Sequence, residues 1–258
     1  IHVIPHIVDV SRFNPSVAPL DLPNPELHNE RYCFLSIFDF HWRKGWDSLL
    51  HAWWQEFSED DGVCLVLKTY SGDDSPQAKS RIHTMLQRFK VDNGYHDKKT
   101  APVLTIGNFL SPGQIEQLYA FADCFVLPSR GEGWGLGYSE AMSMELPTIG
   151  TNWSGNLQFM NRENSYLIDV EKLVPVTNTH LIQIEPGYIG HKMAQPSIDH
   201  LRHLMRHVFQ NQNEAKAMGK IARQSLAENF GPEKIGKQMV ERMQILTQKE
   251  GPVKTGFF

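Results

Sequence analysis

Residues 128–155 read PSRGEGWGLGYSEAMSMELPTIGTNWSG, and they decide the class of fold. The apolar run Asp123–Leu127 before them predicts a buried strand, and Tyr138–Met144 predicts a helix. The turn between them holds four glycines, at positions 131, 133, 135 and 137. Glycine lets the backbone approach a ligand closely, and the free N–H groups at a helix start suit a phosphate or diphosphate. The segment therefore predicts a strand-turn-helix unit with a candidate anion site in its turn.

Two glutamates bracket this candidate anion site, Glu132 in the turn and Glu140 near the first turn of the helix. A carboxylate beside a bound phosphate would repel it, so both acids fit better as acceptors for the hydroxyls of a neighbouring sugar. The spacing leaves one alternative open. In that alternative Glu140 stabilises the helix dipole and Glu132 is a solvated loop residue.

The alternation of strand and helix extends outward from this segment. Continuous apolar runs at Tyr32–Phe38 and Val63–Thr69 predict strands buried on both faces, and Gly45–Phe57 carries apolar residues at helical spacing. Such alternation indicates parallel strands, because these need crossover connections. We expect an α/β fold, a Rossmann-like parallel sheet with helices on both faces and closing C-terminal helices. The other predicted elements are helices over Pro76–Phe89, from Ser111-Pro112, over Leu157–Met160 and from Pro196 onward, and strands over Pro102–Ile106, Pro147–Gly150 and Tyr166–Ile168.

Two segments lack a regular period. Residues 1–30 contain five prolines and predict an extended linker with a strand that leads into the domain. Val170–Pro196 predicts a long loop. We therefore divide the chain into an extended linker with an entry strand, 1–30, and one Rossmann-like domain with C-terminal helices, 31–258.

Two further loops follow predicted strands, so they lie at the edge where open α/β sheets bind ligands. Lys44 stands directly before the helix that Gly45 opens, and its ammonium there would offset diphosphate charge. Phe109 and Leu110 follow the third strand and offer an apolar edge to a base. Taken alone, a solvated lysine and ordinary packing are the simpler interpretations of these residues.

Composition disfavours several classes of protein. The 258 residues carry 25 Lys and Arg against 29 Asp and Glu, a net charge of -4, which disfavours a nucleic-acid-binding surface. No apolar stretch approaches the ~20 residues of a membrane span. Cys33, Cys64 and Cys124 lie in apolar runs without a CxxC pair, so we expect buried thiols in a reducing compartment, the cytoplasm.

Three histidines, His200, His203 and His207, share one predicted helix at spacings of three and four, as metal ligands do. They alternate with apolar residues on an amphipathic helix, and no second ligand cluster accompanies them. We expect no metal site.

Four motifs together resemble one known family. Over roughly Val3–Phe230 the chain resembles the C-terminal, donor-binding domain of retaining family-4 glycosyltransferases of the GT-B fold (glycosyl transferases group 1). The opening VIPHIVDVSRFNP also resembles the interdomain linker of that family, with His6-Ile7 in place of the usual Asn-Gly. The motifs are RKGWDSLL at 43–50, VLTIGNFLSPGQIEQLY at 103–119, EGWGLGYSE at 132–140 and NSYLIDV at 164–170.

The resemblance implies a UDP- or GDP-sugar donor and assigns roles to single residues. Lys44 matches the lysine that contacts the donor phosphates, and Glu132 matches the acid on the hydroxyls of the transferred sugar. Glu140 matches the acid that binds the ribose, and Phe109 and Leu110 fall in the loop that lines the base. The residues whose amides hold the diphosphate and sugar are Trp134, Gly135, Leu136 and Gly137.

Transfer in this family is retaining and generally needs no metal, and the donor is a substrate, so the resemblance implies no cofactor. Lys44 and the helix amides then stabilise charge on the departing nucleotide diphosphate. Two departures from the family pattern stand out. Asp39 and Phe40 lie where a second basic residue is usual, so Arg43 is the remaining candidate for that charge. Gly137 replaces a proline, which loosens the loop without removing its amides.

The resemblance predicts the donor-binding half of a hexosyltransferase acting on an unknown acceptor. The N-terminal acceptor domain, absent from this sequence, would be its partner, and the isolated half would not complete transfer. Asp39 keeps an alternative open, a noncatalytic GT-B-like nucleotide-binding or assembly module. Another GT-B enzyme, an epimerase or a phosphorylase, is a third alternative, although the sequence shows no cofactor-lysine environment for a phosphorylase.

Overall fold

The computed structural model describes residues 2–22, 31–177, 182–183 and 185–249. Its centre is a six-stranded sheet in the order β3-β2-β1-β4-β5-β6, and every pairing in this sheet is parallel. The predicted Rossmann-like α/β class is therefore confirmed. The strands are β1 (Tyr32–Asp39), β2 (Val63–Tyr70), β3 (Val103–Ile106), β4 (Cys124–Leu127), β5 (Thr148–Thr151) and β6 (Tyr166–Ile168).

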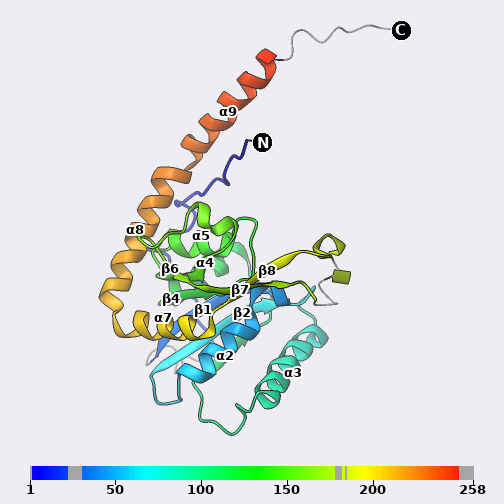
Figure 1. Cartoon of the computed structure of the whole chain (residues 1–258). Coiled ribbons are helices and arrows are strands. Elements are labelled where there is room, and N and C mark those ends of the chain that lie inside the picture. Colours follow the sequence, from blue (N-terminus) through cyan, green and yellow to red (C-terminus); the bar gives the residue numbers. More distant parts are fainter. Residues whose placement is uncertain (1, 23–30, 178–181, 184, 250–258) are drawn as a thin grey trace.

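Helices cover both faces of this sheet (Figure 1). On one face, Trp53 of α2 packs edge-on against Phe34 of β1, with ring centroids 5.5 Å apart. On the other face, Tyr138 of α5 packs edge-on against Phe125 of β4 at 5.9 Å. Burial of such rings is the main stabilising term of the core. The helices are α2 (Trp46–Glu56), α3 (Pro76–Asp92), α4 (Pro112–Phe121), α5 (Leu136–Ser143), α7 (Ile198–Gln210), α8 (Gln212–Phe230) and α9 (Pro232–Lys249), with short 3-10 turns η1 (Trp42–Lys44), η2 (Gly155–Gln158) and η3 (Pro186–Tyr188).

Local sequence explains where several helices begin. Ser111 and Gln114 form a reciprocal capping box at α4, and the side chain of Ser75 accepts a hydrogen bond at the start of α3. By contrast, α2 and α5 begin at Gly45 and Gly135 without a side-chain cap. The two helices that open at the candidate ligand loops therefore begin with N–H groups that no side chain caps.

The structure corrects the predicted loop over Val170–Pro196. The described part of this segment contains two antiparallel strands, β7 (Val170–Pro175) and β8 (Lys192–Pro196), with η3 between them. Most residues of β7 are exposed, because the ribbon stands outside the main sheet. A strand without a buried face carries no alternation of apolar and polar residues, so β7 could not be predicted from periodicity.

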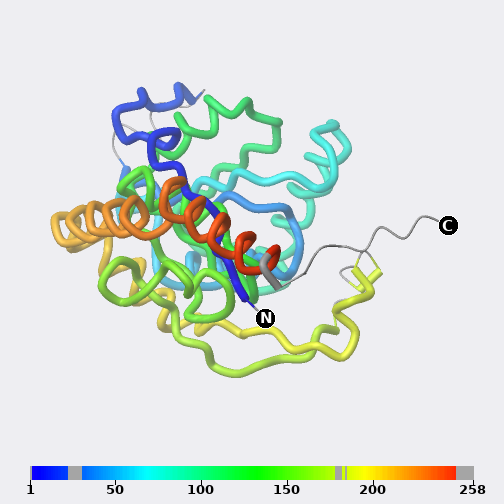
Figure 2. Tube along the Cα trace, turned by 90° about the horizontal axis from the view of Figure 1, so that it is seen from above, coloured from blue at the N-terminus to red at the C-terminus, as the bar shows by residue number. Residues whose placement is uncertain are grey.

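The N-terminal segment also differs from expectation. No strand is present in residues 2–22, where a leading strand was predicted, and 23–30 lie outside the described residues. The segment instead runs over the surface, where the Val8 N–H donates to the Phe230 carbonyl and the Leu20 N–H donates to the Gln117 carbonyl. Its first residues lie beside α9 in both views (Figures 1 and 2).

Three smaller features of the structure bear on the predictions from sequence. The predicted helix over Leu157–Met160 is the 3-10 turn η2, which begins two residues earlier. All three cysteines are free and buried, as predicted. Among the described residues, no helix has the length and apolar character that a membrane span requires.

Candidate functional site

The predicted ligand loops meet where the strand order of the sheet reverses. The chain moves from β1 toward β3 on one side and from β4 toward β6 on the other, so β1 and β4 are the central neighbours. A crevice forms at such a switch point beyond the carboxyl ends of the strands. The loop after β1 carries Arg43 and Lys44, and the loop after β4 carries Glu132.

Gly45 fixes these two loops against each other. Its φ is +69°, and a Cβ atom there would lie 1.9 Å from the Pro128 carbonyl oxygen, a distance that no side chain tolerates. Beside this contact, the Arg130 N–H donates to the Arg43 carbonyl at 2.7 Å. Only glycine permits the approach, so the position of Lys44 relative to the β4 loop depends on Gly45.

Lys44, Arg43 and Glu132 form one buried charge cluster. Lys44 Nζ lies 2.7 Å from Glu132 Oε1, and Arg43 Nη1 lies 3.1 Å from Glu132 Oε2. The Glu132 side chain is only 7% exposed. Burial raises the pKa of Glu132, but Lys44 and Arg43 outweigh burial and hold the pKa below its ordinary value. Glu132 is therefore ionised at neutral pH, and the cluster keeps a net positive charge.

The loop around Glu132 is hydrogen-bonded to the turn that follows β5. The Glu132 N–H donates to Ser154 Oγ at 2.8 Å, and the Gly155 N–H donates to the Glu132 carbonyl at 3.0 Å. A Cβ atom at Gly155 would lie 2.0 Å from the Gly133 carbonyl oxygen. Sequence reasoning assigned no role to Ser154 or Gly155, since their partners lie more than twenty residues away.

The first turn of α5 holds the residues of the predicted anion site. Gly135 has a φ of +93°, and a Cβ atom there would lie 2.5 Å from the Tyr138 ring. No described residue accepts a hydrogen bond from the N–H groups of Leu136 and Gly137. Both residues line a cavity of about 310 Å³. The cavity is lined by His6, Ile37, Lys44, Leu127, Glu132, Trp134, Gly135, Leu136 and Gly137.

Trp134 contributes a buried ring to this cavity. The indole packs against Phe159 at 4.6 Å and Phe230 at 5.5 Å between ring centroids, and the His6 ring lies 5.5 Å away. Its Nε1 has no hydrogen-bond partner among the described residues. Trp134 thus ties the anion loop to the C-terminal end of α8 and to the N-terminal segment.

Glu140 lies beside this cavity and is not among its lining residues. Its carboxylate accepts a hydrogen bond from the buried Tyr119 hydroxyl at 2.9 Å. Burial raises the pKa of Glu140, and the hydrogen bond from Tyr119 opposes that shift only partly. The role of Tyr119 was not predicted, because nothing in the local sequence pairs it with Glu140.

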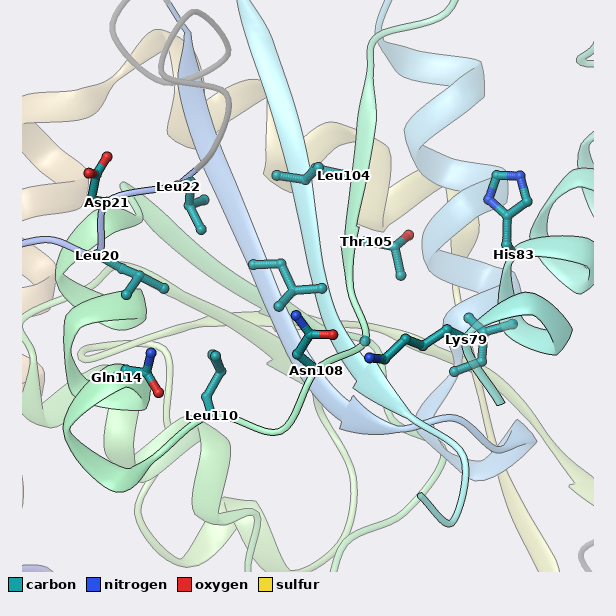
Figure 3. Close-up of a pocket in the computed structure, with 13 residues that line it drawn as sticks. Leu20, Asp21, Leu22, Lys79, His83, Leu104, Thr105, Asn108, Leu110 and Gln114 are labelled. Carbon is teal, nitrogen blue, oxygen red and sulfur yellow. The ribbon is translucent and has the colours of Figure 1, made fainter. Parts of the chain in front are cut away.

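Phe109 and Leu110 do not share one environment. Leu110 lines a separate cavity of about 450 Å³ beside the edge strand β3, together with Leu104 and polar groups such as Lys79 (Figure 3). Phe109 does not line that cavity. Its side chain is 54% exposed, and its ring lies edge-on to Tyr70 with centroids 5.4 Å apart.

Arg130 is a buried residue that sequence reasoning overlooked. Its guanidinium binds both carboxylate oxygens of Asp47 at 2.7 Å, donates to the Trp42 carbonyl at 2.7 Å and lies 4.3 Å from the centre of the Trp42 ring. A bidentate pair of this kind is strong and directional. The pair joins the loop after β4 to α2, so Arg130 fixes the position of the loop that carries Glu132.

The histidines act as packing and hydrogen-bonding residues. His200 Nδ1 lies 3.0 Å from Asp169, and His207 Nε2 lies 3.0 Å from Glu214. No group of three side chains suited to a metal ion occurs within the described residues. His41, next to the Lys44 loop, is different: burial, then Arg43 and Lys44, lower its pKa to about 4.

The fold and loop geometry define the class, a Rossmann-like domain with a candidate anion site at its strand-order switch. A family model for glycosyl transferases group 1 matches residues 30–179, more than half of the chain. The chain therefore belongs to the group 1 glycosyltransferase family, which confirms the predicted resemblance at that level. The retaining mechanism and the family-4 assignment stay predictions.

Solved structures share this fold at low sequence identity. Sucrose-phosphate synthase (tll1590) from Thermosynechococcus elongatus is 20% identical with a TM-score of 0.66, over 96% of this chain and 53% of that one. Anabaena Alr3699/HepE in complex with UDP and glucose is 15% identical with a TM-score of 0.66, over 95% and 57%. This chain thus spans little more than half of either structure.

A third structure has the size of this chain. The C-terminal domain of a glycosyl transferase group 1 family protein (LpcC) from Francisella tularensis is 16% identical with a TM-score of 0.59. The match covers 87% of this chain and 99% of that domain. No curated protein sequence gives a significant match.

Proposed function

We propose that this chain is the donor-binding half of a retaining glycosyltransferase that moves a sugar from a UDP- or GDP-sugar to an acceptor. One observation carries the proposal. The Lys44 cation and the uncapped start of α5 border one cavity of about 310 Å³ at the switch point of the sheet, and Arg43 pairs with Glu132 in the wall of that cavity. A cavity with a cation on one wall and free N–H groups on another suits a diphosphate.

In the proposed complex, the diphosphate accepts hydrogen bonds from the N–H groups of Leu136 and Gly137 and from the ammonium of Lys44. Glu132 already neutralises part of the cationic charge, so the ammonium stays ordered before the donor arrives. Negative charge grows on the nucleotide diphosphate as the bond to the sugar breaks. Preorganised donors stabilise that charge most in the transition state, and we assign this role to Lys44.

The two glutamates take the sugar-binding roles in this proposal. Glu132 is ionised and lies in the cavity wall, where it accepts hydrogen bonds from hydroxyls of the transferred sugar. Glu140 keeps one carboxylate oxygen on Tyr119, which leaves its other oxygen for a ribose hydroxyl. The Trp134 ring and the Gly135 backbone form the remaining wall.

The position of Arg43 favours an active transferase over a noncatalytic module. Asp39 raised that alternative because it stands where a basic residue is usual. Arg43 Nη1 lies 2.6 Å from the Gly131 carbonyl and 3.1 Å from Glu132, so a second cation stands next to Lys44. The site therefore has the charge that the sequence pattern lacked at position 39.

The proposed reaction needs a facing domain. Matches that span 53% and 57% of two larger solved structures support an N-terminal acceptor domain as the partner. Several side chains of α9 are apolar and exposed, among them Met239, Val240, Met243 and Leu246. We propose that the isolated chain binds donor without completing transfer, that it uses no further cofactor, and that its free thiols belong to a cytoplasmic protein.

Thermal stabilisation by nucleotide sugars tests this proposal, since a ligand that binds only the native state raises its apparent stability. The chain is titrated with UDP-, GDP- and ADP-sugars, and at least one is expected to raise the Tm saturably. Lys44→Ala is expected to remove that shift.

Lys99→Ala is the matched control, because Lys99 forms an exposed ion pair with Glu59 at the same 2.7 Å distance. This variant should retain the shift in full. The proposal fails if none of the nucleotide sugars stabilises the wild-type chain, or if both lysine variants lose the shift equally.

A further inference from the structure

A second polar cluster lies at the sheet edge next to the diphosphate cavity, and the proposed function leaves it unused. It combines side chains from the end of β1, the end of β2 and the loops after β2 and β3. Throughout, we call it the β2-end cluster. Its members are Asp39, Lys68, Tyr70, Asp74 and Phe109.

The β2-end cluster faces the same side of the sheet as the diphosphate cavity. Phe34 of β1 packs on Trp53 of α2, so the alternate residues Ile37 and Asp39 face the opposite side, toward α4 and α5. Lys68 is the direct partner of Ile37 in β2 and points the same way. Since Ile37 also lines the diphosphate cavity, Lys68 lies one strand away from it.

The spacing fits the two ends of one nucleotide. Neighbouring strands lie about 4.8 Å apart, so the ends of β2 and β3 stand roughly 5–10 Å from the cavity above β1 and β4. This distance matches the length of a ribose with its attached base. A nucleoside extending from the diphosphate along the sheet edge therefore places its base over the β2-end cluster.

Two aromatic rings in the cluster offer a surface for a base. Tyr70 and Phe109 meet edge-on with centroids 5.4 Å apart, and the Phe109 ring is half exposed. The Tyr70 hydroxyl hydrogen-bonds the Asp39 carboxylate, which raises the pKa of Tyr70 to about 12. Asp39 therefore holds Tyr70 in place, and a base can stack beside the ring pair.

Lys68 is unusual because it is only 4% exposed and forms no ion pair within 4.0 Å among the described residues. Its ammonium lies 5.2 Å from the centre of the Tyr70 ring. Burial lowers the pKa of Lys68, while the charges of Asp39 and Asp74 oppose that shift. A buried ammonium without a close carboxylate retains N–H donors for a carbonyl oxygen of a ligand.

Asp74 supplies the acceptor of the cluster. Its Oδ2 accepts a hydrogen bond from the Phe109 N–H at 3.3 Å, a long contact that leaves the second oxygen unused by any described residue. An ionised carboxylate only accepts hydrogen bonds, and it binds best to two parallel N–H donors. Among the common bases, guanine presents such a pair, at N1 and at the 2-amino group, next to the acceptor O6.

Resting on the proposed function, we infer that this chain selects a guanine nucleotide, with Asp74 accepting from guanine N1–H and the 2-amino group and Lys68 donating to O6. Uracil fits this arrangement less well, because its single N3–H is flanked by two carbonyl oxygens that a carboxylate repels. The inference therefore narrows the donor from a UDP- or GDP-sugar to a GDP-sugar.

Calorimetric titration of the chain with GDP, UDP, ADP and IDP tests the inference. GDP is expected to bind at least tenfold more tightly than UDP or ADP. IDP lacks the 2-amino group and should bind between GDP and UDP. Asp74→Asn keeps the size of the side chain but replaces one acceptor with a donor, so it should lower GDP affinity about tenfold and leave UDP affinity unchanged or higher.

Asp73→Asn is the matched control. Asp73 is the neighbouring exposed carboxylate, and its hydrogen bond goes to Ser75 within its own loop. This variant should keep the preference for GDP.

UDP binding as tightly as GDP would overturn the inference while leaving the proposed function intact. Equal weakening of all four nucleotides by Asp74→Asn would also overturn it, since the residue would then only shape the loop. If no nucleotide binds, the proposed function fails and this inference fails with it.

Discussion

The two ends of the candidate nucleotide site differ in whether their buried lysine is paired with a carboxylate. At the diphosphate end, Lys44 is paired with Glu132 at 2.7 Å and shares it with Arg43. At the base end, Lys68 is more deeply buried but has no carboxylate within 4.0 Å among the described residues. A pair held before binding keeps the cation ordered, whereas an unpaired buried cation costs stability until a ligand supplies an acceptor. The first arrangement suits a charged group, and the second suits a neutral carbonyl.

The backbones at the two ends also differ in how tightly they are packed. Glycine substitutions test this difference, and we expect them to have the largest effects on stability. Gly45 at the diphosphate end and Gly72 at the base end both have positive φ, +69° and +80°. A Cβ atom at Gly45 would collide with Pro128, whereas nothing lies within 4 Å of one at Gly72. We expect Gly45→Ala to lower the free energy of unfolding by about 3 kcal/mol or more, and Gly72→Ala by about 1 kcal/mol.

Urea denaturation of both glycine variants measures these losses, and the midpoint change at unchanged slope gives the difference. Equal losses would show that the contact between the β1 and β4 loops contributes nothing beyond φ strain. The diphosphate end would then be no more rigid than the base end.

The two glutamates should differ in how their contributions to stability change with pH. Glu132 has a folded-state pKa below its ordinary value of 4.5, so its stabilisation is present above pH 4.5 and lost as pH falls through the folded pKa. Glu132→Gln should therefore destabilise the chain at pH 7 by about 2 kcal/mol, and the difference from wild type should shrink below pH 4.5.

Glu140 should show the opposite sign. Burial raises its folded-state pKa, so its contribution to stability is full below its ordinary value of 4.5 and is lost as pH rises through the folded pKa. Glu140→Gln keeps an acceptor for Tyr119 and should stabilise the chain at pH 7 by about 1 kcal/mol. Thermal unfolding of both variants from pH 3.5 to 7.5 checks the signs, and a destabilised Glu140→Gln at pH 7 contradicts the burial argument.

Lys68→Met is expected to have the smallest effect on stability. It contrasts with Lys44→Ala because it removes a lysine that has no ion-pair partner in the described part of the chain. Methionine fills a similar volume without a charge to desolvate, so stability should stay within about 1 kcal/mol of wild type or rise. Nucleotide affinity should nevertheless fall. A Lys68→Met chain that unfolds more readily and binds nucleotide normally would show that Lys68 is a structural residue.

Much of the fold could be predicted from the sequence, because strands and helix starts leave patterns within a few neighbouring residues. The continuous apolar runs of β1 and β2 predicted buried strands, and Ser111-Pro112 predicted the start of α4. The β7–β8 ribbon was missed, because β7 is mostly exposed and carries no period of apolar residues. The site was readable only as a set of residue types. Sequence proposed Lys44 and Glu132 for one crevice, but not that they form an ion pair across 88 positions.

By itself, the sequence determined the parallel α/β fold and the glycine-rich start of α5, and it supplied the residue types that we propose for a diphosphate and a sugar. These follow from periodicity, backbone freedom and side-chain chemistry, which act over a few neighbouring residues. Only the tertiary structure decided that Arg43 supplies the second cation, that Tyr119 holds Glu140, and that Asp74 meets Phe109 across 35 positions. Such pairings depend on the order of strands in the sheet, and strand order is a property of the whole chain.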